Sequence, residues 1–249
     1  MSSVPLDTRN LRLRVAAIAT LIATALIILT GVLHGALSAG TDEAASATIY
    51  EHVLATPAWP AANLFMLIGL LGWLAAFAAI ENAHPAGGWI GRLATSTLAI
   101  GIAASTLLFL IDTVAIPELA EQWDAAGPQQ QATLVAVGDA LQSAIRTPLF
   151  DVLPLFVFGL PFALFGIAYF SARGPVPRWI AAVAAGTGTT TLIAGITWSL
   201  GSTLIPEMFL WAVALPLLWT WGAATGIALL LASRPARRGP ADEVRHSSE

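Results

Sequence analysis

The sequence predicts an all-α fold, a membrane bundle of six transmembrane helices with both termini on the cytoplasmic side. Of the 249 residues, 57% are hydrophobic and only 10% are charged, a composition outside the range of ordinary soluble domains. The hydrophobic residues form six long runs. A helix of about 20 apolar residues crosses the bilayer hydrocarbon and pairs its own backbone polar groups. The basic residues, moreover, gather in alternate connections between the runs.

The six runs define one membrane domain, residues 15–232, between two polar ends. Residues 1–14 form a predicted cytoplasmic N-terminal segment, and 233–249 form a predicted disordered cytoplasmic tail. The first run is longer than the apolar part of a cleaved signal peptide, so we expect it to be retained as a span. The predicted spans are about 15–39, 60–80, 91–115, 149–171, 179–200 and 207–232.

The arginines give these spans their direction. All eleven basic residues are arginines, and Arg146 alone lies in a connection on the outer side of this map. Positive residues close to span ends are retained in the cytoplasm. We therefore expect a multi-pass protein of the bacterial cytoplasmic membrane. The ten arginines on the inner side are Arg9, Arg12, Arg14, Arg92, Arg173, Arg178, Arg234, Arg237, Arg238 and Arg245.

The connections differ between the two sides. The inner ones are short and rich in proline and glycine, whereas the outer ones are longer and acidic. In the segment between spans three and four, Pro117 can open a helical turn and Gly127-Pro128 breaks the chain. An amphipathic outer helix should follow over residues 129–146, because its apolar residues recur at helical spacing. These residues are Leu134, Val137, Leu141 and Ile145.

Two ionisable residues lie inside predicted spans, and they form the centre of the candidate site. His34 is close to the outer end of the first span and Asp112 close to the outer end of the third, so the two are at comparable depth. An ionisable group within the bilayer is costly and is a functional candidate by default. We expect an imidazole–carboxylate pair in a polar cavity open to the outside.

Further polar residues can join this cavity from its outer mouth. Glu118 follows Pro117, Arg146 is the outer cation, and Asp151 opens the fourth span. Together with His34 and Asp112, they are the candidate ligand-binding residues. The alternative for Asp151 is structural, because a carboxylate at a helix N-terminus caps backbone N–H groups.

The sequence lacks the residues and motifs that most catalytic mechanisms require. The chain has no cysteine, which excludes disulfides and thiolate sites. It contains neither a His-Glu-x-x-His motif nor a Gly-x-Ser-x-Gly motif. His34 with Asp112 is a weak metal-site candidate, since a catalytic zinc usually takes three protein ligands. We expect no cofactor and no nucleic-acid partner, and we favour a non-enzymatic protein over an enzyme; the sequence sets no oligomeric state.

Residues 174–182 (GPVPRWIAA), after a fourth span that ends in 165–171 (FGIAYFS), carry a resemblance. Over about residues 12–232, the chain resembles a family of short six-span bacterial membrane proteins, common in actinobacteria and classed as a domain of unknown function. The resemblance implies topology and localisation only. Within this motif, Pro177 starts a helix, Arg178 stays in the cytoplasmic headgroup zone and Trp179 anchors the interface.

Three functional hypotheses follow. The first is an integral membrane protein that binds or moves a small ligand or ion through the outward-facing polar cavity, with the lipid bilayer as its other partner. The second is a membrane-embedded hydrolase, metal-assisted or working by acid/base catalysis, with His34 as the base. The third is a scaffold or accessory subunit without a site. Convergence of His34 and Asp112 would favour the first two.

Overall fold

The computed structural model describes residues 6–37, 46–83, 87–146, 152–170, 176–202, 204–206 and 209–234, without the side chains of 6–9, 32–37, 146 and 211. Helices dominate these residues, and none of them is in a β-strand. The helices are α1 (Leu6–Leu37), α2 (Ser46–Leu54), α3 (Trp59–Ala83), α4 (Gly88–Leu110), α5 (Ile116–Asp124), α6 (Pro128–Leu141), α8 (Leu160–Phe170), α9 (Arg178–Ser199) and α10 (Leu215–Ala232). Four π turns adjoin them: η2 (Ile111–Ala115), η3 (Gln142–Arg146), η4 (Leu153–Val157) and η5 (Leu210–Ala214).

Within the described residues, six helical segments are long and apolar enough to cross a membrane. This confirms the predicted all-α, six-span fold. The first helix begins earlier than expected, since α1 starts at Leu6 within the predicted N-terminal segment. The segments are Asn10–Gly31, Trp59–Ala83, Gly88–Asp124, Leu153–Phe170, Arg178–Ser199 and Ala212–Ala232.

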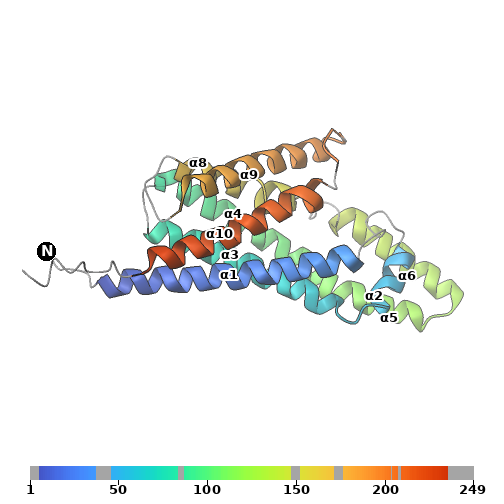
Figure 1. Cartoon of the computed structure of the whole chain (residues 1–249). Coiled ribbons are helices and arrows are strands. Elements are labelled where there is room, and N and C mark those ends of the chain that lie inside the picture. The colour runs from blue at the N-terminus through green and yellow to red at the C-terminus, as the bar shows by residue number, and fades with distance from the viewer. Residues whose placement is uncertain are drawn as a thin grey trace, which may run out of the picture.

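The helices form one elongated bundle (Figure 1). α1 packs along α3 and α10, while α8 packs against α9 and α4. The described chain ends, at the start of α1 and the end of α10, lie at the same end of the bundle, here called the terminal end. α2, α5 and α6 form a separate cap at the opposite end, here called the cap end.

Glycines allow the helix axes to approach closely. Gly188 of α9 lies against the backbone of α8, where an added Cβ would stand 2.3 Å from the nitrogen of Ala163. On α10, Gly222 makes room for Thr24 of α1. Association of membrane helices depends on such close packing, since lipid tails are as apolar as the side chains.

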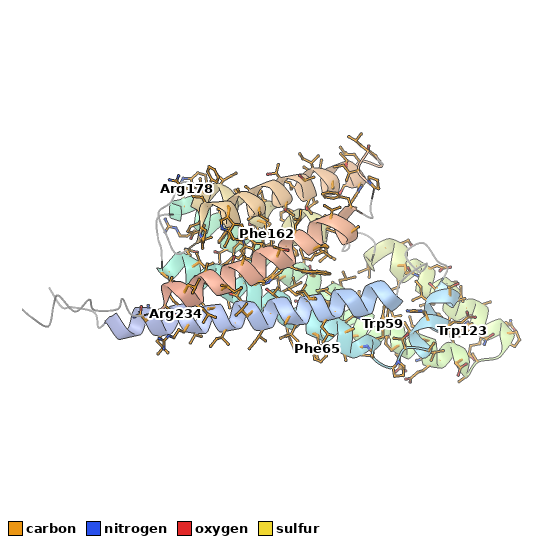
Figure 2. The ribbon with its side chains drawn as sticks, in the orientation of Figure 1. Trp59, Phe65, Trp123, Phe162, Arg178 and Arg234 are labelled. Carbon is orange, nitrogen blue, oxygen red and sulfur yellow. The ribbon has the colours of Figure 1, made fainter. Side chains whose placement is uncertain are left out.

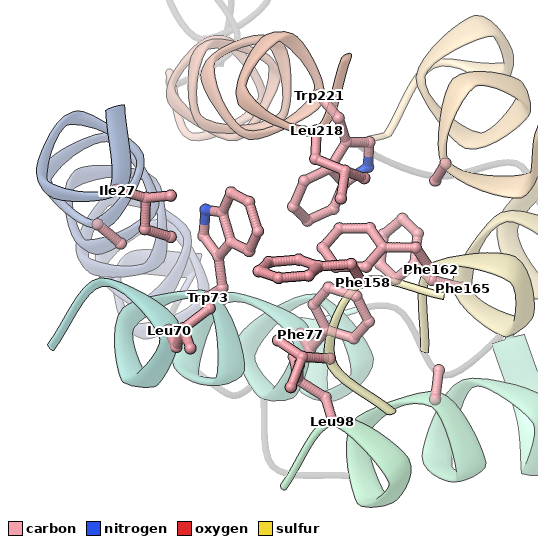
Figure 3. Packing of buried hydrophobic residues seen from close by; sticks show 14 of the residues in the cluster. Ile27, Leu70, Trp73, Phe77, Leu98, Phe158, Phe162, Phe165, Leu218 and Trp221 are labelled. Carbon is pink, nitrogen blue, oxygen red and sulfur yellow. The ribbon is translucent and has the colours of Figure 1, made fainter. Parts of the chain in front are cut away.

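Aromatic rings fill the centre of the bundle (Figure 3). Trp221 of α10 packs edge-on against Phe162, with centroids 4.8 Å apart, and against Trp73 at 5.9 Å. Phe77 and Phe165 complete the group at 5.6 and 5.4 Å from Trp221. Edge-to-face pairs of this kind contribute roughly 0.5–1.5 kcal/mol each beyond their buried area. The group therefore ties α3, α8 and α10 together.

Three of the π turns, η2, η4 and η5, lie at the cap end of a span, and each is accompanied by a proline. Pro117 follows η2, Pro154 lies within η4 and Pro216 follows η5. Proline lacks a backbone N–H, so a carbonyl one turn earlier loses its donor. The wider π turn redistributes the remaining backbone hydrogen bonds. π turns often occur at functional sites.

The cap extends the third span. The helical segment from Gly88 to Asp124 is 37 residues long, roughly 55 Å at 1.5 Å per residue, against about 30 Å of hydrocarbon. Its last part, α5, therefore projects beyond the bundle and carries α2 and α6 (Figure 1). A second apolar cluster holds the cap together; it consists of Ile49, Tyr50, Val53, Trp59, Ile111, Ile116 and Ala120.

The outer helix expected over 129–146 is present as α6 and η3, but its apolar residues do not share one buried face. Leu141 packs against the cap cluster and Leu134 is partly buried, whereas Val137 is 47% and Ile145 39% exposed. The reason is Gly138, against which the Tyr50 hydroxyl of α2 is packed. This contact turns Gly138 inward and leaves the neighbouring Val137 outside.

Candidate functional site

Asp112 lies where α4 leaves the bundle and enters the cap. It belongs to η2 and is only 3% exposed. The backbone N–H of Ile116 bonds to the carbonyl of Ile111, as a π turn requires, and the next residue, Pro117, has no N–H. The carbonyl oxygen of Asp112 therefore lacks both main-chain donors that a helix would offer it.

Trp59 supplies the missing donor. Its indole Nε1 donates to the carbonyl oxygen of Asp112 at 2.8 Å, and the side chain is buried. This hydrogen bond joins the first turn of α3 to η2. Trp59 is therefore a buried contact between the bundle and the cap.

Asn63 is a buried polar residue that the sequence analysis missed. It follows Trp59 by one helical turn on α3, is 1% exposed, and donates from Nδ2 to the carbonyl oxygen of Trp59 at 3.2 Å. The available signal was the presence of an asparagine within an otherwise apolar span. Asn63 adds an amide to the same end of the bundle as Asp112.

The adjoining part of α1 also carries polar groups. Thr30 is fully buried, and its hydroxyl has no hydrogen-bond partner. Gly69 and Gly72 of α3 pack against Ala23 and Ile27 of α1. When this antiparallel pairing is continued along both helices, position 34 comes level with Trp59 and hence with Asp112. The backbone of His34 belongs to α1, but its side chain is outside the described part of the chain.

The other candidates do not join Asp112 in the described structure. Glu118 is exposed on α5 and accepts a hydrogen bond from Gln122 Nε2 at 2.9 Å, one turn along the same helix. It therefore belongs to a solvated helix face. The side chain of Arg146 and the whole of Asp151 lie outside the described residues.

His52 approaches the site from the cap. Its ring packs edge-on against Trp59 with centroids 5.8 Å apart, and its Nε2 is buried without a hydrogen-bond partner. Trp59 thus touches an imidazole on α2 and the carbonyl of Asp112 on η2. Among the described residues, no three His, Asp or Glu side chains come together in a way that could hold a metal ion.

Hydrogen bonds between α2 and α6 hold the cap together next to this site. Asp139 of α6 accepts a hydrogen bond from the backbone N–H of Ser46 at 3.1 Å, at the N-terminus of α2, where a carboxylate also meets the favourable end of the helix dipole. Gln142 donates to the Ser46 hydroxyl at 2.9 Å, and Tyr50 donates to the carbonyl of Leu134 at 3.1 Å. Burial, and secondarily the charge of Asp139, raise the pKa of Tyr50 above 10.0.

Small and polar side chains of α1 and α4 lie inside the bundle, as Thr20 and Thr24 show for α1. Thr97 and Ser105 of α4 are buried, but their hydroxyls donate to carbonyls of their own helix at 2.8 and 2.7 Å. These two residues therefore serve packing. Among the described residues near the cap end, the buried polar atoms without a partner include the Thr30 hydroxyl of α1, His52 Nε2 of α2 and the indole nitrogen of Trp219 on α10, whose ring packs against Gly31.

No protein-family model, curated protein or solved structure matches this chain.

Proposed function

We propose that the protein binds a small cation or small polar ligand at the cap end of its membrane bundle, with Asp112 as the central residue. One observation carries the proposal: a carboxylate-bearing residue that is 3% exposed sits at the junction of a membrane helix with the cap. A buried ionised carboxylate is costly unless it is paired or coordinates a cation. Such a residue in a membrane protein marks a ligand or ion site more often than a purely structural contact.

The neighbouring groups suit such a ligand. Asn63 has an amide oxygen and Thr30 a hydroxyl without a partner, and position 34 is level with both Trp59 and Asp112 by helix register. Carboxylate, amide and hydroxyl oxygens are the ligands that hard cations prefer. The same groups can also hydrogen-bond a small neutral or cationic organic molecule.

We propose that the cap lies outside a bacterial cytoplasmic membrane and that the terminal end lies in the cytoplasm. The described arginine side chains support this orientation, because they are all exposed at the terminal end, as Arg178 and Arg234 illustrate (Figure 2). Trp89 and Trp179 accompany them at the starts of α4 and α9, where they are 68% and 55% exposed. This combination is typical of a cytoplasmic membrane interface.

The π turns near the site suit movement of the bound ligand as well as binding. η2, η4 and η5 all lie at the cap end, so three spans have irregular hydrogen bonding at the level of the site or near it. Discontinuous helices form the ion and substrate sites of many transporters. We therefore propose binding as the basic function and transport of the bound ligand as its use.

The test is ligand-dependent thermal stability of the full chain in detergent. NaCl, KCl, MgCl2, MnCl2 and ZnCl2 are tested singly, with choline chloride as the ionic-strength control. A cation at 100 times its Kd stabilises by about 2.7 kcal/mol, or about 5–11 °C in Tm for a chain of this size. We expect Asp112→Asn to abolish the shift and Glu118→Gln, a matched change of an exposed carboxylate, to retain it.

Two results would contradict the proposal for cations. An equal shift in wild type and Asp112→Asn would place the site elsewhere. The absence of any shift in wild type, with Asp112→Asn correctly folded by circular dichroism, would leave polar organic ligands or the scaffold hypothesis.

A further inference from the structure

Two polar atoms at the centre of the bundle have no hydrogen-bond partner among the described residues. They are the indole Nε1 of Trp221 and the hydroxyl of Thr225, both on α10 and both in fully buried side chains. Several other buried threonine hydroxyls of the bundle donate to their own helix, as Thr20 and Thr191 do at 2.7 and 2.8 Å. Thr225 departs from this pattern.

The two atoms belong to one place. Trp221 and Thr225 are four residues apart on one helix, so their side chains are neighbours on the same face. Figure 3 shows the indole nitrogen of Trp221 on the α9 side of its ring, away from Trp73. The nitrogen of Trp73 points the opposite way, toward α1, and donates to the Thr24 hydroxyl at 3.0 Å. The bundle thus satisfies one central indole and leaves the other open.

Leaving such groups unpaired is expensive. A buried donor or acceptor without a partner destabilises the folded protein, and more so in hydrocarbon surroundings, where no water can hydrogen-bond to it. Two unpaired groups side by side on one helix require an explanation. Since aromatic rings enclose Trp221, the missing partner should be uncharged.

We propose that Trp221 and Thr225 bind a neutral oxygen atom. This oxygen accepts a hydrogen bond from the Trp221 indole N–H and forms a second hydrogen bond with the Thr225 hydroxyl. The oxygen belongs either to a buried water molecule or to the carbonyl or hydroxyl group of a small organic molecule. This site is separate from the cap end, because Gly222, next to Trp221, packs against Thr24 in the middle of α1. It therefore goes beyond the proposed function and does not depend on it.

The sign of a stability change tests the proposal. Thr225→Val removes the hydroxyl and preserves the branched shape. If an oxygen is bound, the substitution removes one of its partners, and the Tm should fall by about 2–4 °C. If the site is empty, the substitution removes a buried unpaired group, and the Tm should stay the same or rise, which would overturn the proposal. Thr191→Val is the matched control, because its hydroxyl bonds only to its own helix; we expect little change.

A second measurement identifies the oxygen. In protein labelled with ¹⁵N-tryptophan, Trp221→Phe assigns the Nε1–H signal of Trp221. A cross-peak from this proton to water would establish a bound water molecule. An organic compound that co-purifies with wild type and is lost from Trp221→Phe, detected by mass spectrometry, would establish an organic ligand. The absence of both would overturn the proposal, whatever the Tm of the variants.

Discussion

Trp59→Phe should loosen the joint between the bundle and the cap. The substitution keeps an aromatic ring in the buried position but removes the indole N–H that donates to the carbonyl oxygen of Asp112 at 2.8 Å. No backbone donor can replace it, because Ile116 bonds to Ile111 and Pro117 has no N–H. The buried carbonyl would lose this donor.

The expected loss of folding stability follows from the lost hydrogen bond and the smaller buried ring. An unpaired buried carbonyl costs about 1–3 kcal/mol. The smaller phenyl ring adds the loss of buried area, at about 25 cal/mol per Å². At about 2–4 °C per kcal/mol for a chain of this size, the Tm should fall by at least about 2 °C.

The assay combines Tm in detergent with amide hydrogen exchange of the cap. Exchange should accelerate in α2 and α5, which meet at this joint. Trp179→Phe is the matched control, because Trp179 is 55% exposed, and it should leave both readings unchanged. Pro117→Ala restores an N–H and should reduce the cost of Trp59→Phe in the double variant. Equal Tm values and unchanged cap exchange in Trp59→Phe would refute the reasoning.

Three further predictions concern the packing and the cap. Gly188→Ala should destabilise the protein by about 1–3 kcal/mol, because the added Cβ would meet the α8 backbone. Gly186→Ala, in open space on the same helix, should be neutral or stabilising by up to about 1 kcal/mol. Thermal melts of the two variants distinguish these outcomes. Thr24→Val should cost about 1–3 kcal/mol, since it leaves the Trp73 indole without its acceptor; a rise in Tm would contradict this. Because the pKa of Tyr50 is raised in the folded protein, its protonated hydroxyl contributes fully to folding stability below pH 10, and this contribution is lost as pH rises further. Thermal melts from pH 8 to 11.5 should show this loss of stability in wild type and not in Tyr50→Phe.

The membrane bundle could be predicted because it follows from composition and run length. Apolar runs long enough to span a bilayer must form helices there, and their positions are visible without tertiary information. The bounds differ where polar residues continue a helix beyond the bilayer. Leu6 and Asp124, at the ends of α1 and α5, both lie well outside the apolar runs predicted for their spans.

The site could be predicted only in part. Asp112 is found from the sequence because a charge in an apolar run is rare. The role of Trp59 could not be found in this way, since it depends on a carbonyl that Pro117 and a π turn leave unpaired in three dimensions. The cap was also missed as a unit, because α2, α5 and α6 are brought together by contacts such as that of Tyr50 with Gly138, which are far apart in the chain.

The measurement that tests the central claim most directly is an inventory of what the purified protein carries. Metals and small molecules bound to wild type, Asp112→Asn, His34→Ala and Glu118→Gln are identified by mass spectrometry after gentle detergent extraction. The account predicts a bound species in wild type and Glu118→Gln that is lost from Asp112→Asn. The same species at equal occupancy in Asp112→Asn would contradict it, and its loss from His34→Ala as well would show that His34 shares the site.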